Sequence, residues 1–108
     1  MEGFPGAVTV CDLQGIILSM NQRSVEVFAA DGGRELLGTN ALDCHPEPSR
    51  TRMAELLATG ATNVYTIEKA GVKKLIFQAP WFRGGVRAGI VELALEIPGS
   101  LPHFVRGG

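Results

Sequence analysis

Apolar and polar residues alternate with a period of two near both ends of the chain, and the period lengthens to that of a helix in between. Near the N-terminus, the apolar runs 7–11 and 16–20 flank a turn at 12–15, and this pattern predicts an antiparallel β-hairpin. From Thr62 onward the alternation returns, and glycine-containing turns interrupt it twice. It therefore predicts three more strands, the last of which spans residues 86–97.

The middle third of the chain carries apolar residues three and four positions apart, which is the spacing of one helix face. Asn21 provides a side-chain acceptor for the free amides of a helix start, and it predicts a helix over 22–30. Residues 34–37 predict one further helical turn. A longer helix is expected at about 46–59, because two prolines fit its first turn and Gly60 suits the left-handed residue beyond its C-cap.

The order of these elements, with two strands before the helices and three after them, predicts an α+β fold. We expect one antiparallel sheet with the helices packed over one face. The length of 108 residues is typical of a single domain. Its core is expected over about 6–97, followed by a C-terminal tail over 98–108. The apolar residues of the tail leave two interpretations open, docking onto the domain or a partner, or a loose end.

Five local features, taken together and in order, resemble the Per-Arnt-Sim (PAS) family of sensor domains. They are the Asp12…Gly15 turn, Asn21, the Glu35–Gly38 turn, the Asp43…Pro46 approach to the long helix, and the strand segment Gly89–Leu93. The resemblance covers nearly the whole chain. It implies a five-stranded antiparallel sheet in the spatial order 2-1-5-4-3, with helices enclosing a small cavity. It also implies sensing of a small ligand, a cofactor or a partner, usually by a homodimer linked to an output domain in two-component or transcription regulation.

Composition and charge exclude several classes of partner. The formal net charge is −1 and the basic residues are scattered, so we expect no direct contact with nucleic acid and no attraction to an anionic membrane. No apolar stretch approaches the ~20 residues that a membrane-spanning helix needs, and the first residues lack the pattern of a secretory signal. Two cysteines are too few for a disulfide framework. A cytoplasmic protein is the expectation.

Cys44-His45-Pro46 is the one local cluster with chemical potential. A neutral imidazole at His45 is suited to ligate haem iron or a metal ion, and the simpler interpretation is a partly exposed residue at the entry of the long helix. Flavin-binding PAS domains with a photoactive cysteine carry it within an Asn-Cys-Arg-Phe-Leu-Gln type motif. Here Asn40 and Cys44 have the wrong spacing, so we expect no flavin photoadduct. The cofactor is left open, with haem as the candidate.

The alternation along the last strands assigns side chains to the two faces of the sheet. Val91, Leu93 and Leu95 form the most apolar row of the last strand, and we expect this row to face the helices, with Glu92 on the outer face. An apolar outer face edged by glutamates favours a dimer contact. The candidates for the dimer interface are Val64, Ile76, Ile90, Glu92 and Ala94. The candidates for the ligand-binding cavity wall are Phe28, Leu37, His45, Met53, Leu56, Leu57, Tyr65, Phe77, Trp81 and Leu93.

These observations favour a sensory domain that acts by binding and does not catalyse a reaction. Three alternatives stay open: a haem- or metal-binding gas or redox sensor that uses His45, a ligand-free dimerisation module, and a small enzyme of a cone-like α+β fold. The enzyme alternative requires Glu92 to face the helices, and the alternation argues against that orientation.

Overall fold

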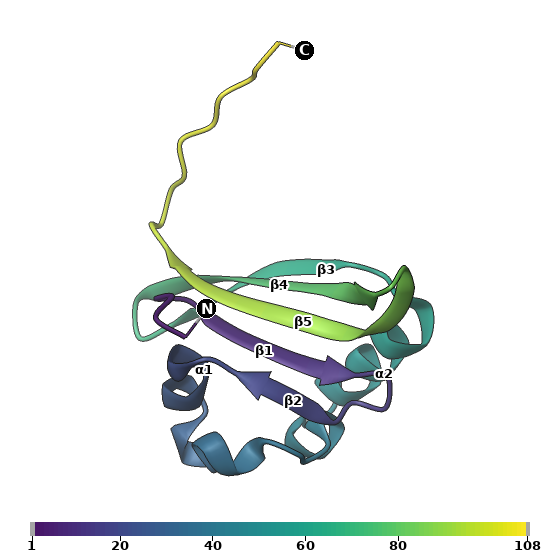
Figure 1. Ribbon diagram of the computed structural model, residues 1–108. Coiled ribbons are helices and arrows are strands. Elements are labelled where there is room, and N and C mark those ends of the chain that lie inside the picture. The colour runs from purple at the N-terminus through teal and green to yellow at the C-terminus, as the bar shows by residue number, and fades with distance from the viewer. Residues whose placement is uncertain (1, 108) are drawn as a thin grey trace.

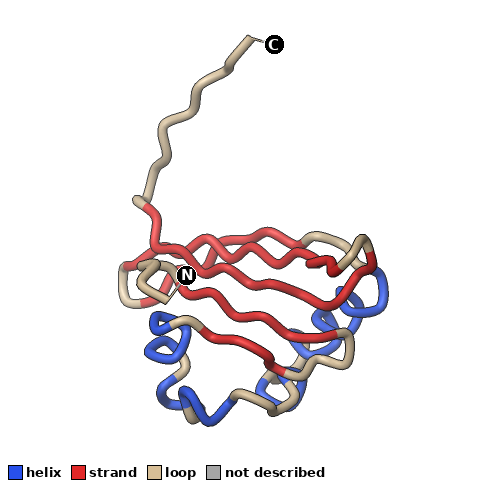
Figure 2. Tube along the Cα trace, in the orientation of Figure 1, coloured by secondary structure: helices blue, strands red, loops and turns tan. Residues whose placement is uncertain are grey.

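The computed structural model describes residues 2–107, apart from the side chain of Cys44. Five antiparallel strands form one sheet in the spatial order β2-β1-β5-β4-β3. The helical segments lie together on one side of this sheet (Figure 1, Figure 2). The predicted fold class and strand order are therefore confirmed. The elements are β1 (Ala7–Asp12), β2 (Ile17–Met20), α1 (Gln22–Val27), η1 (Ala29–Asp31), η2 (Gly33–Leu36), η3 (Ala41–Cys44), α2 (Ser49–Thr59), β3 (Asn63–Lys69), β4 (Val72–Arg83) and β5 (Val86–Ile97).

The turn between β1 and β2 is organised by the carboxylate of Asp12. Its Oδ1 atom accepts hydrogen bonds from the backbone N–H groups of Gln14 and Ile16, both at 2.9 Å. An aspartate that bonds the amides of its own turn is a strong local signal. The hairpin predicted from the sequence is present, because this signal and the alternation on either side of it agree.

Asn21 follows β2 and caps α1. Its Oδ1 atom accepts hydrogen bonds from the N–H groups of Val8 at 2.9 Å and Ser24 at 3.0 Å. Its Nδ2 atom donates to the carbonyl oxygen of Gly6 at 2.9 Å. One buried side chain thus starts the helix and ties it to the beginning of β1. The α-helix itself ends at Val27, earlier than predicted, and the 3-10 turn η1 follows it.

α2 begins later than the sequence predicted. Pro48 is its N-cap residue, and the helix spans Ser49–Thr59. The Oε1 atom of Glu47 accepts hydrogen bonds from the backbone N–H of Thr51 at 2.9 Å and from its hydroxyl at 2.8 Å. Glu47 must stand outside the helix to reach that amide, so both prolines precede the helix. Gly60 has a φ of 71° and ends the helix in the left-handed conformation, as predicted.

β5 lies at the centre of the sheet, between β1 and β4. Gly89 of β5 packs tightly against β1, because a Cβ atom at this position would clash with the carbonyl oxygen of Cys11. The same oxygen accepts a hydrogen bond from the indole Nε1 of Trp81 at 2.9 Å. A side chain at position 89 would therefore push the two central strands apart.

The strands alternate as predicted, but the predicted assignment of the two faces is wrong. Ile90 and Glu92 line a cavity together with residues of the helical segments, whereas Leu93 is the cross-strand partner of Phe77 on the opposite face. Phe77 is 37% exposed while the neighbouring Gln78 is only 7% exposed. Most of the predicted dimer-interface residues consequently lie on the helix side, namely Ile76, Ile90, Glu92 and Ala94. Val64 lies on the outer face as predicted, as the partner of Phe77.

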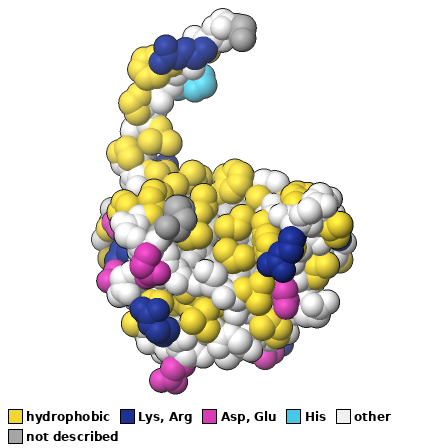
Figure 3. Space-filling view, viewed as in Figure 1, with side chains coloured by type: hydrophobic (Ala, Val, Ile, Leu, Met, Phe, Trp, Pro, Cys, Tyr) yellow, Lys and Arg dark blue, Asp and Glu magenta, His cyan; other side chains and the backbone are white. Residues whose placement is uncertain are grey.

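The prediction failed because it gave the most apolar row of β5 to the core. The row Val91, Leu93 and Leu95 is left on the other face, where hydrophobic side chains gather in the space-filling view (Figure 3). The core under the helices consists of Cys11, Ile17, Met20, Leu36, Ala41, Met53, Leu56, Leu57 and Ile90.

The C-terminal residues 98–107 continue from β5 and extend away from the sheet (Figure 1). Leu101, Phe104 and Val105 are exposed along this segment. Among the helices within residues 2–107, none combines the length and the apolar character needed to cross a membrane.

Candidate functional site

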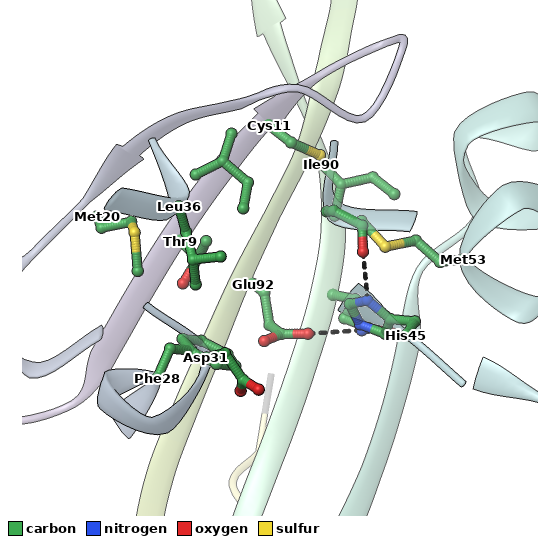
Figure 4. A pocket seen from close by; sticks show the side chains of 13 residues that line it. Thr9, Cys11, Met20, Phe28, Asp31, Leu36, His45, Met53, Ile90 and Glu92 are labelled. Atoms are coloured by element: carbon green, nitrogen blue, oxygen red, sulfur yellow. Dashed lines mark hydrogen bonds between the residues drawn. The ribbon is translucent and has the colours of Figure 1, made fainter. Parts of the chain in front are cut away.

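A cavity of about 120 Å³ lies between the inner face of the sheet and the helical segments. Strands β2, β1, β5 and β4 form its floor, and residues between Phe28 and Met53 form its roof (Figure 4). Apolar side chains make up most of the wall, with a few polar groups among them, which is the composition of pockets for small molecules. The lining residues are Thr9, Cys11, Ile17, Met20, Phe28, Asp31, Leu36, Ala41, His45, Met53, Gln78, Ile90 and Glu92.

Several residues predicted for the cavity wall lie in or beside it. Those that line it are Phe28, His45 and Met53. Leu56 and Leu57 are buried in the adjoining core under α2. Tyr65 lines a shallower groove next to the cavity, which it shares with His45 and Met53. The helix-side residues of this region were predictable because the helical spacing leaves only one face to bury.

Four other predicted residues lie away from both the cavity and this adjoining region. Phe77 and Leu93 are on the outer face, for the reason given above. Leu37 follows η2 and is 38% exposed, and Leu36 takes the place in the cavity wall that was predicted for it. The indole of Trp81 lies at the contact between β1 and β5, where its Nε1 donates a hydrogen bond to the carbonyl oxygen of Cys11.

A row of polar side chains crosses the inner face, and it was not predicted from the sequence. Asn63, Gln78 and Glu92 are cross-strand partners on β3, β4 and β5, and the row continues to Thr9 on β1. Gln78 Nε2 donates to Glu92 Oε2 at 2.7 Å, and Asn63 Nδ2 donates to Gln78 Oε1 at 2.9 Å. A guanidinium nitrogen of Arg52 on α2 donates to Asn63 Oδ1 at 3.2 Å. This hydrogen-bonded row connects α2 with the cavity floor.

The other end of the polar row reaches α1. The hydroxyl oxygens of Thr9 and Ser24 lie 2.6 Å apart, and Ser24 is fully buried. The cavity therefore lies between two polar links, one from the sheet to α1 and one from the sheet to α2. Polar residues in phase on four neighbouring strands were the signal in the sequence that could have located this site.

The charge of Glu92 acts on its neighbours. Burial raises the pKa of the Cys11 thiol above its ordinary value of 9.0; a backbone hydrogen bond with Ile90 opposes this rise, and the carboxylates of Asp12 and Glu92 add to it. Burial also raises the pKa of Tyr65, and the carboxylate of Glu92 raises it further. Cys11 is thus a neutral, poorly nucleophilic thiol at physiological pH.

His45 is the residue that the sequence offers for haem or metal binding. Its Nδ1 atom lies 2.6 Å from the carbonyl oxygen of Ala41, so Nε2 is the nitrogen left for a metal. An engineered apolar cavity of about 150 Å³ holds one benzene molecule, and a porphyrin is many times larger than benzene. The cavity alone, at about 120 Å³, is therefore too small for haem. Within residues 2–107, no group of three or more His, Cys, Asp or Glu side chains is placed to hold a metal ion, with the Cys44 side chain outside the described part.

Comparison with solved structures relates the chain to PAS domains, whereas no protein-family model and no curated protein matches it. One similar structure is the Aer2 receptor from Vibrio cholerae, described as a dual PAS-haem oxygen sensor, with 18% identity over 86% of this chain and 95% of that chain and a TM-score of 0.61. Another is the PAS domain of Bordetella pertussis BvgS, with 21% identity over 90% of this chain and 80% of that chain and a TM-score of 0.62.

A third similar structure is the VqmA dimer from Vibrio cholerae. The identity is 14%, the TM-score is 0.65, and the match covers 90% of this chain. It covers 48% of the VqmA chain, so the present chain spans about half of that protein. Together with the strand order and the position of the helices, these comparisons show that the chain has a PAS-like fold.

Proposed function

We propose that this PAS-like domain is a sensor that binds a small ligand in the cavity and transmits its presence through contact with a second copy of the chain. The domain acts by binding and catalyses no reaction. The fold shared with the Aer2 oxygen sensor and with the PAS domain of BvgS supports the sensory class.

The cavity is the observation that carries the proposal. Protein cores are packed as tightly as organic crystals, and voids larger than a water molecule are few. The cavity of about 120 Å³ exceeds that size severalfold, and its wall includes residues of the sheet and of η1, η2, η3 and α2. Its wall includes Phe28 next to η1, Leu36 of η2, and Met53 of α2. A ligand at this place touches all of them, and its binding favours the helix packing that fits it best.

The outer face of the sheet supports contact with a second copy. Phe77 is 37% exposed and adjoins Leu93 of the apolar row on β5, and Val64, its partner on β3, is 50% exposed. Exposed apolar patches of this kind mark interaction sites. The centre of the face carries no charge, so two copies can pair across a two-fold axis without burying an unpaired ion. VqmA, which shares the fold, was itself determined as a dimer.

The alternative of a small enzyme requires Glu92 to face the helices, and Glu92 does line the cavity on that side. Two further observations support binding instead. Among the described residues, Glu92 is hydrogen-bonded to Gln78 and His45 to Ala41, so the two groups suited to proton transfer are each engaged in holding the wall together. The thiol of Cys11 has a raised pKa and is a weak nucleophile.

A cavity-filling variant tests the proposal. Ala41 is buried in the cavity wall, and Ala41→Leu adds three carbon atoms to it. In ¹⁵N-labelled wild-type protein, 1-butanol is expected to shift the amide resonances of Ile90 and Met53. Ala41→Leu is expected to weaken this binding by at least about tenfold, because it occupies the volume that the probe needs. Ala79→Leu, which adds the same group on the outer face, is the matched control. Undiminished binding in Ala41→Leu would contradict the cavity as the site.

A further inference from the structure

The ionised groups in the cavity wall are of one sign. Glu92 lies on the floor, on the central strand β5, and Asp31 lies at the exposed rim (Figure 4). The lining residues include no Lys or Arg among the residues that the structure describes, and His45 is the one basic side chain. A ligand that enters this cavity therefore meets negative charge and hydrogen-bond acceptors.

One of the two carboxylate oxygens of Glu92 accepts a hydrogen bond that fixes the side chain in place. Its Oε2 atom accepts the hydrogen bond from Gln78, and Gln78 is itself buried and bound to Asn63. From residues 2–107, Oε1 receives no hydrogen bond. A carboxylate oxygen beside an apolar wall is stabilised only when a donor reaches it, either from water or from a ligand.

The remaining wall is apolar and adjoins this carboxylate. Phe28, Ile90 and Met53 come from three different elements and face the same space as Glu92 (Figure 4). The volume of about 120 Å³ is slightly below that of a cavity that holds benzene. A fitting ligand is therefore small, with about five to seven non-hydrogen atoms.

Resting on the proposed function, we propose that the ligand class is a small organic ammonium ion with an apolar body. Its N–H groups donate to Oε1 of Glu92, and its hydrocarbon part fills the space beside Phe28 and Ile90. Such charge-assisted hydrogen bonds are about twice as strong as neutral ones. A carboxylate ligand of the same size would be repelled by Glu92 and by Asp31 at the rim.

The hydrogen-bonded row makes this site able to report binding. Gln78 and Asn63 connect Glu92 to Arg52, which lies on α2. A cation at Oε1 competes with Gln78 for the charge of the same carboxylate, and the next members of the row adjust to that change. α2 is thus the element on which ligand binding acts most directly.

Three probes of similar size test the ligand class: n-butylammonium, 1-butanol and butanoate. Each is titrated into ¹⁵N-labelled wild-type protein, into Glu92→Gln and into Glu96→Gln. Glu92→Gln keeps an acceptor for Gln78 and removes the charge. Glu96→Gln makes the same change on the same strand, outside the cavity, and is the matched control. Backbone resonances report that each variant is folded.

We expect n-butylammonium to bind wild-type protein at least about tenfold more tightly than 1-butanol. The Glu92→Gln variant is expected to lose this preference. The Glu96→Gln control is expected to retain it. Equal or tighter binding of 1-butanol or butanoate would overturn the ligand class and leave the sensor proposal standing. Failure of every probe to shift the resonances of cavity residues would overturn both.

Discussion

Asn21 illustrates how much of this fold depends on single polar side chains. Its carboxamide caps α1 and bonds the backbone at Val8 and Gly6, so it joins the first helix to the first strand. Side chains of this kind are costly to remove, because each deleted bond leaves a backbone group without its partner.

Asn21→Ala is expected to lower the free energy of unfolding by about 2–4 kcal/mol, because it removes the cap of α1 and also leaves two backbone groups without hydrogen-bond partners. Urea denaturation followed by circular dichroism measures this loss. Asn40→Ala is the control, because Asn40 also caps a helical turn, through Leu42, but its second bond, to Gln14, is exposed. The control is expected to cost about 1 kcal/mol. Equal losses in the two variants would show that the link to β1 adds nothing.

At the start of α2, helix stability depends on an ionised side chain outside the helix. Hydrogen bonds from the hydroxyl and the backbone N–H of Thr51 lower the pKa of Glu47 below its ordinary value of 4.5. A lowered pKa in the folded state means that Glu47 stabilises the fold above pH 4.5, and that this contribution is lost as the pH falls below that value.

Glu47→Gln is expected to remove this pH-dependent contribution while keeping an acceptor for the Thr51 amide. The difference in unfolding free energy between wild type and Glu47→Gln, measured by denaturation at pH 7 and at pH 3, should shrink on acidification. A difference that is the same at both pH values would refute the role of the charge.

The elements that could be predicted from the sequence are those whose determinants are local. Asp12 bonds within its own turn, and Gly60 ends the helix that it follows, so the sequence around each contains the relevant partners. The start of α2 was predicted too early because both prolines fit a first helical turn, whereas the acceptor for the Thr51 amide is Glu47, outside the helix. The 3-10 helix η3 was not predicted, since its short span carries no periodic pattern.

Which face of the sheet the helices cover is not a local property. The alternation along β5 was predicted correctly, yet Glu92 faces the helices and Leu93 does not. Period-two patterns define two faces without stating which one is covered, and the prediction chose the more apolar face. Phe28 and Met53 were found because a helix has one apolar stripe. Gln78 and Thr9 were missed because their partners lie on other strands.

Because the apolar row of β5 faces away from the helices, the outer surface of the sheet is apolar. A sheet whose most apolar row faces away from its own helices is stabilised when a second apolar surface covers that row. In the proposed dimer, the partner provides it, and the signal passes from the cavity through the central strands to the contact.

Leu93→Glu is expected to weaken dimerisation by at least about tenfold, because it places a charge at the centre of the apolar face. Sedimentation velocity over a range of protein concentrations measures the change. Leu37→Glu, at an exposed position on the helix side, is the control and should leave the dimer intact. Wild-type protein that stays monomeric at high concentration would exclude this contact.

The central claim is that the cavity lies between Glu92's face of the sheet and the helices. Methyl nuclear Overhauser effects in ¹³C-labelled protein saturated with n-butylammonium test it most directly. We expect contacts from the probe to the Ile90 and Met53 methyl groups, and none to Leu93. Contacts from the probe to Leu93, with none to Ile90, would contradict it.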